Sequence, residues 1–180
     1  MTLTPPKRPP DDEQRLVVLY ALRQLSPCTE TQLLQFLAEE DIMNYFDMMI
    51  ALQDLCARGQ AVRSQKEAGG HTYQPTPAGD EALSLFGGRV PSSVKKLLKE
   101  TGGAWRARFA AEEQYPFKIS QTERGDYELL LSVREQGADT FRLSLTAPTR
   151  ELALKLARGW PEKAGKIYET VFRTLSEEEP

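Results

Sequence analysis

Hydrophobic residues are concentrated near the start of the chain, in a segment with helical character. Residues 11–25 open with three acidic side chains, which favour the positive end of a helix dipole. The stretch from Leu16 to Leu22 is then an unbroken apolar run. Because successive helical residues are separated by 100°, such a run is apolar on every side. This helix is predicted either to be the buried hub of a domain or to lie in a dimer interface.

Capping residues predict two more helices. Ser26-Pro27 ends the first helix, and the sequence Thr-Glu-Thr-Gln at 29–32 is a capping box that starts the second. Asn44 is predicted to cap the third helix and Gly59 to end it. The predicted core stripe of the third helix comprises Tyr45, Met48, Met49, Leu52, Leu55 and Cys56.

A hairpin and a fourth helix complete the first predicted domain. Residues 61–64 and 71–74 are predicted strands, joined by a tip with a Gly-Gly turn signal. Thr76-Pro77 is predicted to cap and open a helix over 78–86. Three helices, a hairpin and a fourth helix over residues 11–90 are typical of a winged helix-turn-helix domain.

A helical connector is predicted next, over residues 91–113. Its apolar positions keep helical phase through Gly102-Gly103, which leaves open one long helix or two helices meeting at the glycines. The polar side carries several basic residues, which fit either a solvated face or contact with an acidic domain. Residues 1–10, with four prolines, are predicted to be a flexible arm.

Alternation of apolar and polar residues predicts a sheet in the domain at 114–180. Three strands follow one another as an antiparallel meander, and residues 149–175 form an amphipathic helix that covers it. Gly159-Trp160-Pro161 is predicted to kink or interrupt this helix, and Trp160 to anchor the core. The predicted fold class is therefore α+β: a winged helix, a helical connector, and a three-stranded antiparallel sheet covered by a long C-terminal helix.

Charge is distributed unevenly between these parts. The 180 residues have a net charge of -3, but residues 11–90 hold 6 Lys and Arg against 12 Asp and Glu, a net charge of -6. Residues 91–180 hold 15 against 14, a net charge of +1. Because nucleic-acid binding gains much of its free energy from neutralised phosphates, any DNA contact by the first domain requires a local basic patch.

The third helix is the expected DNA-recognition element, yet its outward face is acidic. A helical wheel places Asp47, Asp54, Arg58 and Ala51 opposite the core stripe. Carboxylates accept only from the amino group of cytosine and repel phosphates. This face is predicted either to read DNA or to be a solvated acidic surface, and the second interpretation is slightly preferred.

The hairpin offers the better basic patch. The predicted DNA-binding residues are Asn44, Arg58, Arg63, Lys66 and His71. Arg63, Lys66 and His71 are placed to straddle a phosphate backbone or enter a minor groove, although basic clusters also occur on solvated hairpins.

Catalytic and metal-binding patterns are not found in the sequence. There is no Gly-rich phosphate loop, GxSxG or HExxH motif, so no enzymatic activity and no cofactor are expected. Two cysteines and one histidine are too few for a structural zinc site, and Cys28 and Cys56 are predicted to be buried or half-buried thiols. No apolar run is long enough for a membrane span, and residues 1–10 lack the apolar core of a signal peptide, so a cytoplasmic protein is expected.

Several short sequence motifs resemble those of a known family. They are residues 16–22, Asn44-Tyr45-Phe46, Thr76-Pro77-Ala78-Gly79, residues 89–93, and Trp160 with Ile167-Tyr168. Together with the order of elements, they resemble the bacterial domain-of-unknown-function family 4364. The resemblance implies an intracellular winged-helix protein, generally presumed to be a transcriptional regulator, with no established ligand, operator or catalytic residue. Pro161 departs from the continuous C-terminal helix of that family.

Three functional hypotheses follow from these patterns. The first is a homodimeric regulator that binds DNA through the wing and the third helix. The second is a non-enzymatic protein-interaction module that uses Asp47 and Asp54 or an open sheet edge. The third is a small-molecule sensor with a pocket between the sheet and the last helix, where aromatic side chains line either a pocket or a dry core.

Overall fold

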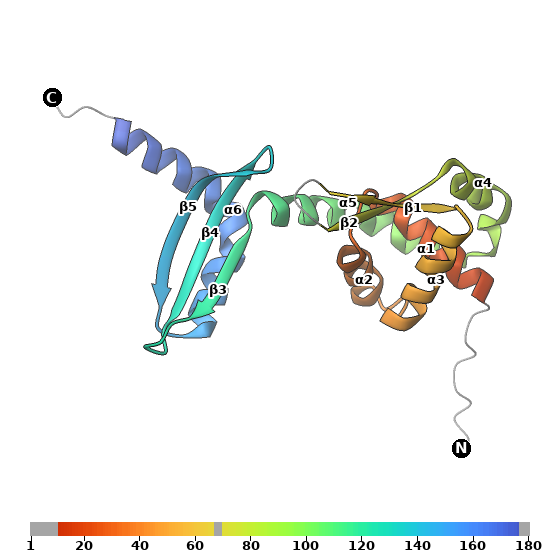
Figure 1. The fold of residues 1–180 in the computed structure, drawn as a ribbon, viewed down its shortest axis with the longest axis horizontal. Helices are drawn as coiled ribbons and strands as arrows, with labels where there is room; N and C mark the ends of the chain where they lie inside the picture. Colours follow the sequence, from red (N-terminus) through yellow and green to blue (C-terminus); the bar gives the residue numbers. More distant parts are fainter. Residues whose placement is uncertain (1–10, 67–69, 177–180) are drawn as a thin grey trace, which may run out of the picture. The chain divides into compact units, whose positions relative to one another are not determined.

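The computed structural model describes residues 11–66 and 70–176, which form an α+β fold (Figure 1). The chain divides into two compact units, residues 1–107 and 108–180. The division falls within helix α5 (Ser92–Gln114). The predicted flexible arm, residues 1–10, lies outside the described residues.

The first unit has the order of elements predicted for a winged helix. Strands β1 and β2 pair antiparallel, from Ala61 opposite Pro75 to Gln65 opposite His71. The elements are α1 (Asp11–Leu25), α2 (Glu30–Glu39), α3 (Tyr45–Ala57), β1 (Ala61–Gln65), β2 (His71–Pro75), α4 (Pro77–Phe86) and the 3₁₀ helix η1 (Gly87–Arg89).

The predicted caps start α2, α3 and α4. In the capping box of α2, Gln32 N–H donates to the Thr29 hydroxyl (3.2 Å) and Thr29 N–H donates to the Gln32 side chain (2.9 Å). Asn44 Oδ1 accepts from the first turn of α3, and Thr76 Oγ1 accepts from that of α4. These bonds satisfy N–H groups that have no partner inside the helix, so local chemistry sets where each helix begins.

Helix α1 is the hub of the first unit. Val18, Leu19, Ala21 and Leu22 are completely inaccessible to solvent. Helices α2, α3 and α4 and strand β2 all pack on α1. The hub interpretation of the apolar run is thus confirmed.

Helix α3 buries Met48, Leu52 and Leu55 as predicted, but two positions differ from the prediction. Ala51 was expected to point outward but is only 3% exposed, whereas Tyr45 was expected in the core and is 43% exposed. Ala51 lies three residues after Met48 and four before Leu55, so it shares their face, and its small side chain allows close packing on α1. Tyr45 instead packs edge-on against Phe46 at the start of the helix.

Helix α5 is continuous through the glycine pair. Within the first unit, Trp105 of α5 packs on Phe36 of α2, with 5.7 Å between ring centroids, and its indole N–H donates to Glu40 Oε1 (2.8 Å). A Cβ at Gly102 would lie 3.0 Å from the Gln24 Cβ. The missing side chain therefore lets α5 pass close to the end of α1.

The second unit is a meander covered by one helix, as predicted. Strands β3 (Phe117–Gln121), β4 (Tyr127–Glu135) and β5 (Ala138–Ala147) pair antiparallel in the order β3-β4-β5. Helix α6 (Arg150–Ser176) packs on one face of this sheet (Figure 1).

Trp160 anchors the core of the second unit. Its ring stacks on Phe141 with 6.4 Å between centroids, and its indole N–H donates to the Ser132 carbonyl oxygen (2.9 Å). The predicted interruption at Pro161 is wrong, because α6 continues through it. Proline removes one helical hydrogen bond, whereas Ala157, Trp160 and Ala164 stay packed on the sheet and hold the helix together.

Two glycine substitutions, one in α4 and one in α5, are expected to change stability in opposite directions. A Cβ at Gly79 would lie 2.2 Å from the Gln60 carbonyl oxygen and 3.1 Å from Leu19 Cδ1, whereas one at Gly103 meets nothing within 4 Å. We expect Gly79→Ala to lower the free energy of unfolding by about 1–3 kcal/mol, because backbone must move. Gly103→Ala should raise it by about 0.5–1 kcal/mol, because alanine favours a helix interior. Urea unfolding measures both changes. An unchanged free energy of unfolding for Gly79→Ala would contradict the close contact of Gly79 with Gln60 and Leu19.

Candidate nucleic-acid interface

The hairpin of β1 and β2, which is the predicted wing and is called the wing below, is held against the start of α2 by backbone hydrogen bonds. Cys28 N–H donates to the Tyr73 carbonyl (3.2 Å), and Tyr73 N–H donates to the Cys28 carbonyl (2.8 Å). Because Cys28 immediately precedes the capping residue Thr29, these bonds fix the first turn of α2 beside strand β2. The position of the wing thus depends on a bridge between segments 45 residues apart in the sequence.

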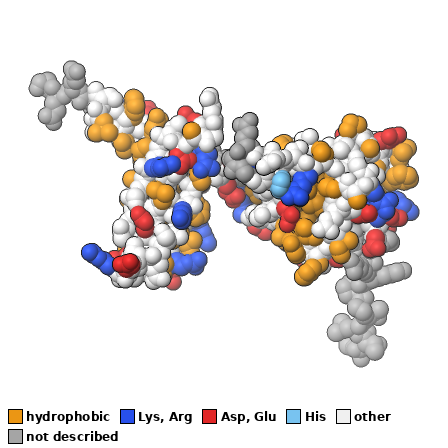
Figure 2. Space-filling model, viewed as in Figure 1, with side chains coloured by type: hydrophobic (Ala, Val, Ile, Leu, Met, Phe, Trp, Pro, Cys, Tyr) orange, Lys and Arg blue, Asp and Glu red, His pale blue; other side chains and the backbone are white. Residues whose placement is uncertain are grey.

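A groove lies between the first turn of α2 and the wing. Its volume is about 380 Å³, and Thr29, Thr31, Arg63 and His71 contribute to its lining. The pairing register puts Arg63 opposite Tyr73 and His71 opposite Gln65, so Arg63 and His71 project from the same face of the hairpin. Figure 2 shows the histidine beside basic side chains on this surface. Two side chains from the predicted list therefore meet at the positive end of a helix dipole.

Two further residues modify the charge near this groove. Glu30 also lines it and adds one carboxylate. Lys66 lies at the base of the hairpin tip, where its backbone N–H donates to the Gly70 carbonyl (3.0 Å). Residues 67–69 of the tip lie outside the described part of the chain.

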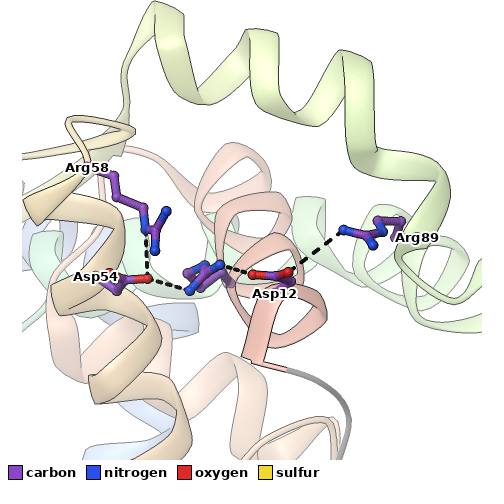
Figure 3. A network of polar contacts seen from close by, with 5 residues as sticks. Asp12, Asp54, Arg58 and Arg89 are labelled. Carbon is purple, nitrogen blue, oxygen red and sulfur yellow. Dashed lines mark hydrogen bonds and ion pairs between the residues drawn. The ribbon is translucent and has the colours of Figure 1, made fainter.

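Asp54 on α3 is clamped by two arginines (Figure 3). The same carboxylate oxygen accepts from Arg58 Nε (2.9 Å) and from Arg15 Nη1 of α1 (2.6 Å). Partial burial acts to raise the pKa of Asp54, but the hydrogen bonds and charges of Arg58 and Arg15 outweigh it and lower that pKa. Asp54 is therefore a charged carboxylate whose negative charge is balanced by two arginines, and Arg58 is held in place by its bond to Asp54.

Asn44 and Asp47 form a second local pair. Asn44 Oδ1 accepts from Asp47 N–H (3.0 Å) while Asn44 Nδ2 donates to Asp47 Oδ2 (2.9 Å). Both ends of the Asn44 amide are thus engaged in starting α3. The structure places Asn44, Asp47, Asp54 and Arg58 on or beside α3, apart from the groove that holds Arg63 and His71.

Helix α3 also exposes apolar side chains that the sequence analysis did not single out. Phe46 is 74% exposed and Ile50 is 60% exposed. They are four residues apart, so they lie together on the outer surface of the helix beside Asp47. Their position outside the buried stripe on a helical wheel was the available signal. Arg15 was also missed and had no local signal, because its partner Asp54 is 39 residues away.

The cysteines lack the properties of reactive thiols. Burial raises the pKa of Cys28 to about 12. Burial also raises the pKa of Cys56, although the charge of Arg63 opposes that shift. Thiols with raised pKa values contain little of the nucleophilic thiolate at neutral pH. Among the described residues, no group of His, Cys, Asp and Glu side chains is arranged to hold a metal ion.

These features define the first unit as a helix-rich domain with a hairpin groove lined by Arg63, His71 and Glu30, joined in sequence to a sheet-and-helix unit. The chain belongs to the DUF4364 family, whose model, described as a domain of unknown function, matches residues 14–175. Neither a curated protein nor a solved structure matches the chain. None of the described helices combines the length and hydropathy needed to cross a bilayer.

The clamp on Asp54 predicts a pH-dependent contribution to stability. Because its pKa is lowered in the folded protein, the charged form stabilises the fold above the unfolded value of about 3.9, and this contribution disappears as pH falls through the folded pKa. We expect Asp54→Asn to be clearly destabilising at pH 7 and much less so near pH 3. Urea unfolding of both proteins at both pH values measures this difference. An equal loss at the two pH values would show that the carboxylate charge is not responsible.

Proposed function

We propose that this protein is a cytoplasmic, non-enzymatic winged-helix transcriptional regulator that binds DNA as a homodimer. The observation that carries the proposal is the groove in which Arg63 and His71 of the wing face the first turn of α2. A guanidinium group, an imidazole and a helix N-terminus are all suited to phosphate oxygens. Phosphate contacts of this kind position a protein on a duplex.

The ion pairs of α3 support the same proposal. An acidic outward face would repel phosphates, but Asp54 is neutralised by Arg15 and Arg58. The repulsion expected from the sequence is therefore reduced at this position. In the proposed complex Arg63, Lys66 and His71 contact the phosphate backbone of DNA. Arg58 is paired with Asp54, so only its terminal nitrogens are available to DNA. Asn44 caps α3 and makes no DNA contact.

The end of α6 supports homodimerisation. The face of α6 that packs on the sheet continues past it as Val171 and Leu175, with Phe172 beside them. Phe172 is 64% exposed and Leu175 is 82% exposed. Because α1 is buried inside the first unit, α6 is the better dimer surface of the two. A two-fold dimer would also match the symmetry common in operators.

A second candidate function is a protein-interaction module that does not bind DNA. The exposed Phe46 and Ile50 on α3 favour it, since aromatic residues are enriched at protein interfaces and apolar side chains contribute nothing to phosphate binding. Asp47 beside them would add a charged rim contact. Under this alternative, loss of partner binding follows substitutions at Asp47 and Asp54 rather than in the wing.

The wing proposal predicts a specific loss of DNA affinity. The double variant Arg63→Ala/Lys66→Ala should weaken binding about tenfold or more on all sequences, and reduce the salt slope by roughly 1 for each lost phosphate contact. The measurement is fluorescence anisotropy on fragments selected from the protein's own genome, at several salt concentrations. Lys96→Ala/Lys99→Ala on α5 removes the same charge and is the matched control.

Either of two results would contradict this prediction. One is an unchanged salt slope in the wing variant, and the other is an equal effect of the α5 control. Failure of the unmodified protein to bind any fragment at near-physiological salt would favour the protein-interaction module instead.

The dimer proposal predicts that a charge at the end of α6 separates the subunits. Leu175→Glu should convert a dimer to a monomer in sedimentation velocity experiments at roughly tens of micromolar protein. Thr170→Glu adds the same charge to an exposed position of α6 and should leave the dimer intact. A monomeric unmodified protein at these concentrations would refute the proposal.

A further inference from the structure

A cavity that is partly open to solvent lies at the surface of the first unit, away from the wing. It has a volume of about 230 Å³ and lies among α1, the end of α3, α4 and η1. Apolar side chains line part of it, namely Leu16, Leu55, Ala82 and Phe86. A cavity of about 150 Å³ accommodates a benzene ring. The present one therefore has room for a single ring with a small polar substituent.

Three guanidinium groups converge on the same cavity. Arg15 of α1, Arg58 after α3 and Arg89 of η1 all line it, together with one carboxylate, that of Asp12. Including Asp54, which clamps Arg15 and Arg58, the cluster has three positive and two negative charges (Figure 3). A locally positive site is thus built into a segment whose sequence has a net charge of -6.

The hydrogen bonds of the arginines leave donors for a ligand. Arg58 bonds Asp54 through Nε, and the two terminal nitrogens of a guanidinium are further donors. The Arg89 Nη1 is 3.9 Å from Asp12 Oδ2, which is longer than a hydrogen bond. A planar carboxylate matches the fork of an arginine and would replace this long contact with short ones.

We propose that this cavity binds a small organic carboxylate with a single-ring or similarly sized apolar body. The carboxylate pairs with Arg89, and the apolar body lies against Leu16, Leu55, Ala82 and Phe86. Both parts of the ligand are required, because a purely inorganic anion would leave the apolar lining unused and a neutral ring would leave the guanidinium groups unmatched. The proposal does not depend on DNA binding, since neither the groove at the wing nor its residues take part.

The test is an NMR titration of the full-length protein with benzoate, followed through backbone amide shifts. Benzoate should shift the amides of Leu16, Leu55 and Phe86 saturably, with a Kd of about 1 mM or tighter. Benzamide has the same shape without the charge and should bind at least about tenfold more weakly. Arg89→Gln should weaken benzoate binding about tenfold, since one charge-assisted pair is lost.

A matched control separates the cavity from general charge effects. Arg23→Gln removes one arginine from the other end of α1, where its guanidinium lies over the Tyr20 ring, and should leave benzoate affinity unchanged. The dispersion of the amide spectrum shows that each variant is folded. Equal affinities for benzoate and benzamide, an equal effect of Arg23→Gln and Arg89→Gln, or the absence of saturation would each overturn the proposal.

Discussion

The burial of α1 is the constraint on which the first unit depends. An apolar run that covers every side of a helix must be surrounded, because exposing it would forfeit roughly 25 cal/mol for each Å² of apolar surface. Helices α2, α3 and α4 and strand β2 enclose it. Each of these elements is therefore positioned by its contact with α1. The surfaces available for binding are the outer sides that this arrangement leaves.

Residues at the two ends of α1 also make polar contacts or close approaches to other elements. Arg15 lies on the half-buried side of α1, just before its apolar run, so it reaches Asp54 on α3 and takes part in the cavity beside η1. Near the other end of α1, Gln24 lies close to the backbone of Gly102 in α5. The hub thus supplies polar contacts at its ends and apolar contacts in its middle. The second unit has its own constraint, the burial of Trp160 between α6 and the sheet.

Local chemistry made most of the fold predictable from the sequence. Caps such as Thr29, Asn44 and Thr76 act on N–H groups within three residues, and strand alternation acts at a spacing of two, so both are visible in a short window. The candidate site was less predictable. The groove depends on the Cys28–Tyr73 bridge, and the neutralisation of Asp54 depends on Arg15, both of which join distant segments. Ala51 was misplaced because an alanine carries too little hydrophobic signal to mark a buried face.

Charge counting along a segment gives only part of the electrostatics of a binding surface. The first 80 residues after the arm are strongly acidic in sequence, yet the pairing of Asp54 with two arginines cancels its field at short range. The cavity beside η1 is locally positive for the same reason, since its arginines outnumber their partners. The ion pairs do not change the exposure of Phe46 and Ile50 on the outer surface of α3. The wing groove therefore carries the case for phosphate contact, and the apolar pair on α3 bears on what else that helix contacts.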